Sequence, residues 1–327
     1  MRTIVPGVRT LVLISFLFAS TLHSNAQSIT TGNGKVEIGL GFGPLFFLGD
    51  LGGNHGTGKR FIKDVNLPLT NISKGIYVNL YPAEWLGFRV ALNQGRLEGY
   101  DSLIKDKGDA EYYRKKRNLQ FRSPLLEAYA AVEVYPTVFL EQYDGLQGKI
   151  RPYFVAGAGI FKFKPQGQYY SPDGRAHWVD LQPLHLEGQG MAEYPDRPNY
   201  KLMSLEIPLG AGFKYYIKEN LYVGLEIMHR KSFSDYVDDV SLDYIDNSLF
   251  ANYLPADKVA MANQLYFREG FVPGGTTSRI PAIGEQRGNP KQNDSFFSSI
   301  IRFGWRLNDS NSPNGRAARQ MRCPAFY

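Results

Sequence analysis

Apolar and polar side chains alternate with a period of two along most of the chain, the spacing of β-strands whose two faces meet different environments. In the segment 203–217, Leu205 and Leu209 share one face while Glu206 and Lys214 share the other. No helical period of useful length appears after residue 26. The pattern predicts eight strands, at 35–48, 74–83, 86–100, 119–135, 150–164, 203–217, 220–234 and 295–307.

The connections between these strands alternate in length. Short connections follow the second, fourth and sixth strands, at 84–85, 136–149 and 218–219. Long connections follow the first, third, fifth and seventh, at 49–73, 101–118, 165–202 and 235–294. Transmembrane β-barrels have an even number of strands, short periplasmic turns and long extracellular loops. We therefore expect an all-β fold, an eight-stranded antiparallel up-and-down transmembrane barrel over 35–307.

The first 26 residues have the pattern of a secretory signal peptide. Arg2 and Arg9 supply its positive end, a short apolar stretch follows, and small residues precede a cleavage site between Ala26 and Gln27. The stretch is about half the roughly 20 residues that a spanning helix needs. We expect an exported chain in the cell outer membrane, with residues 27–34 as a short lead into the barrel.

Composition excludes several other classes. With 43% hydrophobic and 21% charged residues, the chain is expected to fold. A mean hydropathy of −0.30 leaves no room for several transmembrane helices. The single Cys excludes a disulfide framework and a thiolate metal cluster, and we expect no cofactor. The 37 basic residues are scattered among 31 acidic ones, so a nucleic-acid partner is not expected.

One face of the predicted strands carries charge. Lipid offers no water to solvate charges, so this face should point into the barrel and the apolar face should contact outer-membrane lipid. Eight strands enclose a lumen just wide enough for side chains to fill, so we expect acids and bases to pair as a plug rather than to line a transport pathway. The predicted network comprises Glu37, Arg89, Glu127, Glu133, Glu206, Lys214, Glu226, Arg302 and Arg306.

Aromatic residues gather near the predicted strand ends. Tyr and Trp often form girdles at the two interfaces of a membrane barrel. We expect that position for Tyr81, Trp85, Tyr135, Tyr153, Tyr215, Tyr216, Tyr222 and Trp305.

Two apparent chemical motifs are weak. Residues 53–59 have the spacing of a phosphate-binding loop, but Arg60 stands where a Ser or Thr should hold the metal, so no nucleotide is expected. His229 is the one histidine in a predicted strand, and its odd separation from Ser232 places the two on opposite faces. We expect no catalytic residues.

Acidic residues cluster where the seventh strand ends. Asp235, Asp238 and Asp239 do not match the twelve-residue calcium loop, which needs Gly at its sixth position and Glu at its last. We expect these carboxylates to cap turns in a surface loop and to pair with bases such as Arg287. Metal binding is the alternative.

The last twenty residues, 308–327, form a polar tail. The tail should lie in the periplasm if eight strands return the chain there. It is either a disordered end or a docking segment in which Arg316, Arg319 and Arg322 contact an acidic surface. Cys323 is either a free thiol or a partner in an intermolecular disulfide.

Several short segments together resemble the PorG-like outer-membrane barrel proteins associated with type IX protein secretion and gliding motility. The segments, in order, are EIG (37–39), GDL (49–51), NLQFRS (118–123), PYFVAG (152–157), LQPL (181–184), EGQG (187–190), IPLG (207–210), DYVDDVS (235–241), RGNP (287–290) and CPAF (323–326).

The resemblance implies a role. A protein of this family would be an integral outer-membrane component that docks a periplasmic ring of PorK and PorN, and it would have no established catalytic residues. Our leading hypothesis is therefore a non-enzymatic barrel that anchors a secretion or motility assembly. The alternatives are a narrow porin-like or adhesin-like surface barrel, or a lipid-modifying enzyme at the barrel rim.

Overall fold

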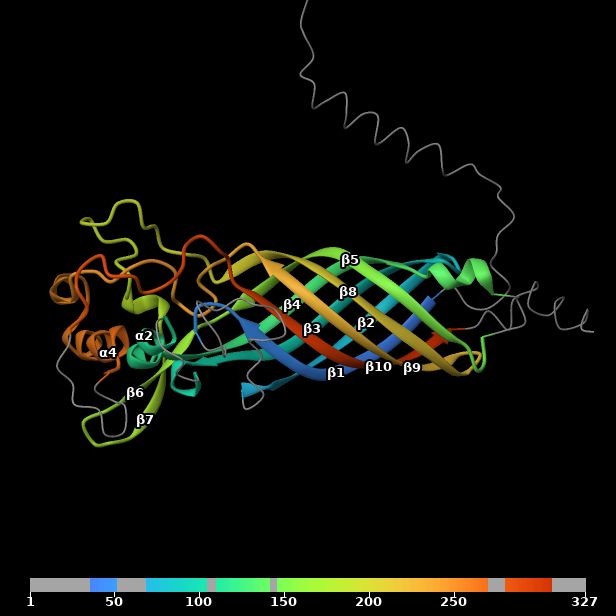
Figure 1. The fold of residues 1–327 in the computed structure, drawn as a ribbon, viewed down its shortest axis with the longest axis horizontal. Coiled ribbons are helices and arrows are strands. Elements are labelled where there is room, and N and C mark those ends of the chain that lie inside the picture. The colour runs from blue at the N-terminus through green and yellow to red at the C-terminus, as the bar shows by residue number, and fades with distance from the viewer. Residues whose placement is uncertain (1–35, 52–68, 105–109, 142–145, 270–279, 308–327) are drawn as a thin grey trace, which may run out of the picture.

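The computed structural model describes residues 36–51, 69–104, 110–141, 146–269 and 280–307. Its main body is a barrel of eight long strands, with a folded assembly of loops at one end (Figure 1). The barrel strands are β1 (Val36–Leu48), β2 (Asn71–Ala83), β3 (Leu86–Tyr100), β4 (Gln120–Val134), β5 (Ile150–Phe163), β8 (Met203–Lys218), β9 (Leu221–Ser232) and β10 (Ser295–Leu307).

The barrel is closed. Each barrel strand pairs antiparallel with its neighbours along the chain, in the order β3-β2-β1-β10-β9-β8-β5-β4, and β3 also pairs with β4. The first and last strands complete the ring, with Val36 opposite Leu307 and Leu48 opposite Ser295. The expected eight-stranded up-and-down barrel is confirmed, with strand ends within three residues of those predicted.

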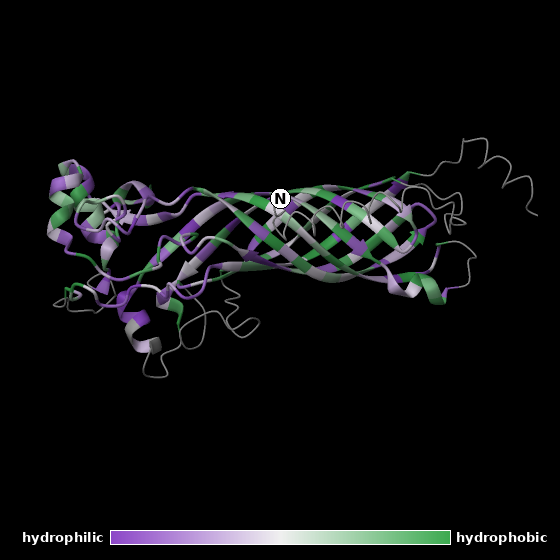
Figure 2. Cartoon of the chain, turned by 90° about the horizontal axis from the view of Figure 1, so that it is seen from above, coloured by the Kyte–Doolittle hydropathy of each residue, from purple (hydrophilic) through white to green (hydrophobic). Residues whose placement is uncertain are grey.

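The two sides of the wall differ as lipid and lumen require. Along β10, Ile301, Phe303 and Trp305 point outward and are exposed, while Arg302 and Arg306 point inward and are buried. The other barrel strands repeat this alternation, and apolar residues recur along the outer wall (Figure 2). A tilted transmembrane strand needs about 9–11 residues. The strands here have 12 to 16, so they extend beyond the apolar band.

The long connections gather at one end, which we call the loop end; the opposite end, with the short connections, is the turn end. The described loop-end residues outside the barrel strands form what we call the cap. The cap contains a hairpin of β6 (Gln166–Tyr170) and β7 (Ala176–Asp180), and three helices, α2 (Ala110–Arg117), α3 (Phe250–Tyr253) and α4 (Ala256–Tyr266). Short 3₁₀ turns occupy Asp101–Leu103, Pro136–Leu140, Gln182–Leu184 and Asn247–Leu249.

The three cap helices were not predicted from the sequence, in which no helical period of useful length appears after residue 26. The helices have 8, 4 and 11 residues, too few to show a clear period. The α2 sequence AEYYRKKR has no apolar stripe, and α4 is held by burial of Ala262, Leu265 and Tyr266. Tertiary packing rather than local pattern stabilises such helices. No helix among the described residues is long and apolar enough to cross a membrane.

Buried apolar side chains form two clusters. One lies in the barrel towards the turn end and is mostly aromatic, with Tyr81, Tyr135, Tyr153 and Tyr222 among its members. The other joins the loop-end mouth to the cap, and includes Phe161 from the barrel wall and Tyr266 from α4. The cap is therefore a packed structure continuous with the barrel.

Candidate functional site

A buried network of charges fills the lumen. We call its twelve members the luminal network: six carboxylates and six cations that point inward from the wall or the β2–β3 turn. All are at most 3% exposed. The members are Glu37, Glu84, Arg89, Glu127, Glu133, Arg151, Glu206, Lys214, Glu226, Arg230, Arg302 and Arg306.

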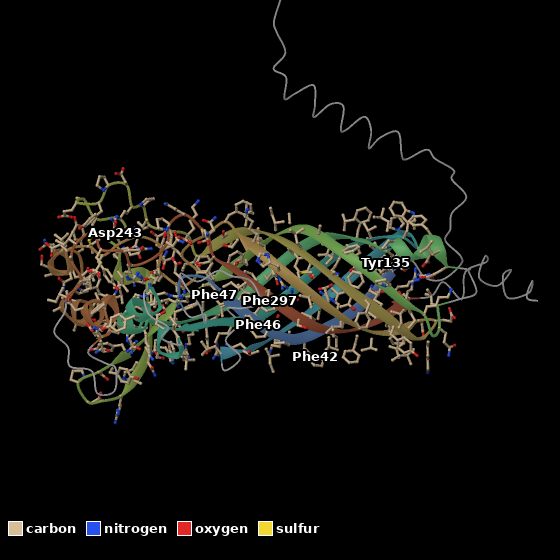
Figure 3. The ribbon with its side chains drawn as sticks, in the orientation of Figure 1. Phe42, Phe46, Phe47, Tyr135, Asp243 and Phe297 are labelled. Atoms are coloured by element: carbon tan, nitrogen blue, oxygen red, sulfur yellow. The ribbon has the colours of Figure 1, made fainter. Side chains whose placement is uncertain are left out.

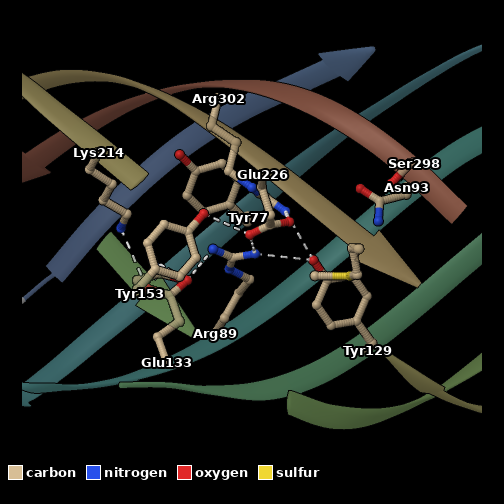
Figure 4. Close-up of polar contacts among 12 residues, drawn as sticks. Tyr77, Arg89, Asn93, Tyr129, Glu133, Tyr153, Lys214, Glu226, Ser298 and Arg302 are labelled. Atoms are coloured by element: carbon tan, nitrogen blue, oxygen red, sulfur yellow. Dashed lines mark hydrogen bonds and ion pairs between the residues drawn. The ribbon is translucent and has the colours of Figure 1, made fainter. Parts of the chain in front are cut away.

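The middle of the network is centred on Glu226 of β9. Its Oε2 accepts hydrogen bonds from Arg89 Nη1 at 2.6 Å and from Tyr153 Oη at 2.8 Å. Its Oε1 accepts from Arg302, so one carboxylate holds two guanidinium groups (Figure 4). Arg89 also pairs with Glu133. Strands from opposite parts of the chain are thus joined across the lumen.

Towards the turn end, Lys214 takes the central place. Its Nζ lies 2.7 Å from Glu37 Oε1 and 3.5 Å from Glu133 Oε2, and donates to Tyr81 Oη at 2.6 Å. Tyr222 Oη donates to the same Glu37 oxygen at 2.6 Å. The ammonium is therefore surrounded by carboxylates and phenol oxygens.

The turn-end opening is crossed by a further ion-pair group. Glu84 receives Arg306 Nη2 and Arg151 Nη1, each at 2.7 Å. Arg151 also reaches Glu141 at 2.9 Å, beside the 3₁₀ turn after β4. These contacts tie β10 and β5 to the β2–β3 turn.

Towards the loop end, Arg230 pairs with Glu127 at 2.9 Å, and Asn93 Nδ2 donates to the same carboxylate at 2.7 Å. Glu206 lies beside Glu127. Neither of its carboxyl oxygens has a hydrogen-bond partner among the described residues. Above this level, Phe121, Phe161 and Phe296 belong to the apolar cluster shared with the cap. The lumen is thus filled by ion pairs and covered by apolar side chains.

All nine charged residues proposed from the sequence lie inside the barrel, and eight of them form ion pairs. The exception is Glu206, beside Glu127. Sequence reasoning left three members out of the network. The alternation of inward and outward residues along β9 and β5 places Arg230 and Arg151 on the inward face, so both could have been included. Glu84 lies in a turn, where this alternation does not apply.

The expected aromatic girdle was wrong for most of its members. Five of the eight aromatic residues point into the lumen and are buried: Tyr81, Tyr135, Tyr153, Tyr216 and Tyr222. Trp85, Tyr215 and Trp305 are partly or well exposed. Buried phenol groups find partners in the charges of the network, which is why these tyrosines face inward.

Two glycines make room for inward tyrosines. A Cβ added at Gly39 would lie 2.3 Å from the Tyr77 ring, and one at Gly304 would lie 2.2 Å from the Tyr222 ring. The two phenol groups meet each other in a hydrogen bond. The strand glycines therefore permit close packing of aromatic rings against the wall.

The acidic cluster after β9 is buried in the cap, which corrects the expectation of a surface loop. Asp238 accepts backbone hydrogen bonds from Leu51 at 2.9 Å and Val240 at 3.0 Å, and Asp235 accepts from Ser241 Oγ at 2.8 Å. The carboxylates thus cap turns, as expected. Among the described residues, no group of acidic, His or Cys side chains is arranged to hold a metal ion.

Arg287 pairs with a carboxylate from another loop. Its Nη1 lies 2.8 Å from Glu187 Oε1 and donates to the backbone oxygen of Asp239 at 2.7 Å. The Asp239 carboxylate instead accepts from Tyr200 Oη at 2.5 Å. The sequence predicted that Arg287 pairs with an acid of its own loop, 235–294, and this was wrong. The acid that pairs with Arg287 is Glu187, which comes from a distant segment.

Burial perturbs the titration of this cluster. It raises the pKa of Asp239 to about 7, a rise that the charge of Arg287 limits. Burial, with the charges of Asp50 and Asp235, also raises the pKa of Asp238. An unfolded Asp titrates near pH 4. The cap is therefore most stable below about pH 4, where Asp239 is neutral in both the folded and the unfolded chain. Its free energy of unfolding falls as the pH rises from about 4 to 7, and the loss is complete above 7.

No catalytic arrangement is found among the described residues at the position considered from the sequence. His229 is half-buried on the outer side of the wall, whereas Ser232 is buried on the inner side.

A groove of about 580 Å³ opens on the outer wall, lined by Ile38, Val78, Val90, Phe303 and Trp305 among others. Such a surface suits lipid chains, not a polar reaction.

Three regions considered from the sequence lie outside the described residues. They are the signal segment and lead (1–35), the glycine-rich 53–59, and the tail 308–327 with Arg316, Arg319, Arg322 and Cys323.

Comparisons with known proteins give structural likenesses at low sequence identity. No family model matches the chain, and no curated protein matches it. The alignment with Neisserial surface protein A covers 85% of this chain and 100% of that protein, at 7% identity and a TM-score of 0.36. Ail, the attachment invasion locus protein of Yersinia pestis, covers 84% and 99%, at 9% identity and a TM-score of 0.34. The outer membrane protein OprG of Pseudomonas aeruginosa covers 86% and 99%, at 12% identity and a TM-score of 0.35. The barrel assignment rests on the strand pairing of this chain itself.

Proposed function

We propose that this protein is a non-enzymatic outer-membrane anchor, a barrel whose closed lumen conducts nothing and whose ends carry the binding functions. The observation that carries the proposal is the filled lumen. Ion pairs cross it from Glu84 at the turn end to Arg230 near the loop end, and the cap packs over the mouth. Open aqueous channels belong to barrels of about sixteen strands.

Orientation follows from the loop lengths. Membrane barrels place long loops outside the cell and short turns in the periplasm. The experiment uses two exposed positions, Ala251 in the cap and Lys218 at the turn end, in a Cys323→Ser background. A membrane-impermeant maleimide should label Ala251→Cys on intact cells and Lys218→Cys only after lysis. Labelling of both positions on intact cells, or of neither, contradicts the proposal.

A finer proposal concerns the periplasmic partner, and its support is the resemblance of short sequence segments to PorG-like proteins. In this proposal the barrel docks a PorK/PorN-like ring through the tail 308–327 or through the turn 136–149. Arg316, Arg319 and Arg322 would supply charge-assisted contacts, and Cys323 would supply a thiol for a covalent link.

The docking test is a pull-down of the tagged full chain from solubilised outer membrane. Ring proteins in the eluate support the finer proposal, and a barrel recovered alone contradicts it. Deletion of 308–327 should remove the ring proteins while the barrel stays resistant to detergent in an unboiled gel. Unchanged recovery would place docking in the turn 136–149 instead of the tail.

The cap favours a second function, adhesin-like binding at the cell surface. Loops that only join strands need no core of their own, yet here Leu184, Ile245, Phe250 and Tyr266 are buried in a shared cluster. A rigid, folded surface is what a binding module requires. Cells lacking the protein should then regain surface attachment with the full chain but not with a variant whose 235–294 loop is replaced by a short turn.

A further inference from the structure

Five cations face outward at the loop end of four neighbouring strands. Strands β2, β3, β4 and β5 are consecutive around the barrel. Each contributes one cation near its loop end, and a fifth follows β5 directly. We call this group the basic rim: Lys74, Arg96, Arg122, Lys162 and Lys164.

The basic rim lies at the height where the apolar band ends. Lys74 is nine residues from Ala83, Arg96 ten from Leu86, and Lys162 twelve from Ile150, counting from the turn end of each strand. About 9–11 tilted residues span the hydrocarbon. The rim therefore stands at the lipid headgroups of the leaflet on the loop side.

Its side chains point away from the barrel. Lys74, Arg96 and Lys162 alternate with buried residues along their strands and are exposed. They share the face of outward apolar residues such as Ile76 and Leu92. The long side chains are thus placed beside lipid, with their charges at the edge of the band.

The rim has more positive charge than the acids beside it neutralise. Arg96 lies 3.5 Å from Glu98, and Lys164 lies 2.7 Å from Asp180, both in exposed pairs of little strength. Arg96 of β3 lies opposite Pro124 of β4, and Glu98 lies opposite Arg122, so the two arginines are diagonal neighbours, about 7–8 Å apart, with Glu98 beside both. The single carboxylate of Glu98 offsets only one of these two positive charges.

One member of the rim is held in place by the cap. The Arg122 guanidinium lies 4.2 Å above the Trp178 ring of β7, and its Nε donates to Gln166 of β6 at 3.0 Å. The β6–β7 hairpin therefore fixes a cation at this height, instead of leaving it on a mobile side chain.

We propose that the basic rim binds the phosphate groups of anionic membrane lipids in the leaflet on the loop side. The proposal rests on the outer-membrane anchor function, because it needs a lipid leaflet at this height. Phosphates between Lys74, Arg96, Arg122 and Lys162 relieve the repulsion among these cations, while the lipid chains lie on the apolar wall below. The interaction gives the barrel a preferred depth and a preferred lipid neighbour.

The experiment measures lipid bound to the detergent-solubilised full chain by native mass spectrometry. The probes are phosphatidylglycerol and phosphatidylcholine at equal concentration. The rim variant carries Lys74→Gln, Arg96→Gln and Lys162→Gln, and the matched control carries Lys218→Gln, Lys258→Gln and Lys291→Gln. Wild type should bind more phosphatidylglycerol than phosphatidylcholine. At low ionic strength, the ratio of the two bound lipids should fall roughly fivefold for each cation that the rim variant lacks.

The outcomes separate this proposal from the anchor function. The control should keep the wild-type preference, and excess inorganic phosphate should leave it in place, because the lipid chains add binding on the wall. Equal loss in rim variant and control, absence of a preference in wild type, or its abolition by inorganic phosphate overturns the lipid site. A wild-type chain that shows no heat-modifiable barrel in an unboiled gel overturns the anchor function itself.

Discussion

The ion pair between Glu226 and Arg302 offers the sharpest perturbation of the lumen. Glu226→Gln keeps the size of the side chain but removes the charge that holds two guanidinium groups. Arg89 retains Glu133, whereas the carboxylate partner of Arg302 is Glu226 itself. The substitution therefore leaves Arg302 buried, at 3% exposure, without a neutralising charge.

The magnitude follows from that loss. Removing one partner of a buried ion pair costs about 3–5 kcal/mol, because the other charge stays buried and uncompensated. Arg302→Met is milder, since Glu226 still accepts from Arg89 and Tyr153, and we expect about 1.5–3 kcal/mol. The double variant removes both charges, so it should be more stable than Glu226→Gln alone, with a coupling of roughly 1–3 kcal/mol.

The assay is equilibrium unfolding by urea in detergent micelles, followed by tryptophan fluorescence. The free energy of unfolding is compared among wild type, both single variants and the double variant. A cost below about 1 kcal/mol for Glu226→Gln, or strictly additive effects in the double variant, would refute the claim that charge pairing holds the lumen together.

Three further predictions concern the wall and the cap. Ile301→Arg puts a charge on the lipid side and should cost roughly 2–4 kcal/mol in the same unfolding assay if the site lies near the midplane, a loss that Ile301→Leu should not show. Gly304→Ala should destabilise the barrel, because its Cβ would lie 2.2 Å from the Tyr222 ring; unchanged urea resistance would show that the ring has room to shift. Asp239→Asn keeps the acceptor for Tyr200 and removes the buried charge, so it should stabilise the cap at pH 8 by on the order of 4 kcal/mol and have no effect near pH 4. Thermal scans at both pH values check this, with the partly exposed Asp246→Asn as control, which should show no stabilisation at pH 8.

The sequence predicted the barrel well because the barrel is encoded locally. Period-two alternation in β8 and β10, and the alternating lengths of the connections, need no knowledge of distant contacts. The same parity places Arg302 beside Glu226 in the lumen. Lipid outside and packed side chains inside leave each strand residue only two possible environments.

Two features were missed for different reasons. The inward tyrosines were predictable, because residues an even number of positions apart in a strand share a face. Tyr216 is two positions from Lys214, and Tyr81 is four positions from Tyr77. More weight was given instead to the aromatic composition near the strand ends. The cap was not predictable in this way. Its contacts join residues far apart in sequence, such as Arg287 with Glu187, and irregular loops have no period that would reveal which side chains are buried.

Ion conductance tests the sealed barrel most directly. Purified full chain is inserted into a planar lipid bilayer in salt solution, with an open sixteen-stranded porin as the control for insertion. The structure predicts no channel currents from the barrel, because Glu226, Lys214 and Glu84 bind their partners across the lumen and the cap covers its mouth. Stable, voltage-independent single-channel steps from the heat-modifiable protein would contradict the sealed lumen and make this chain a pore.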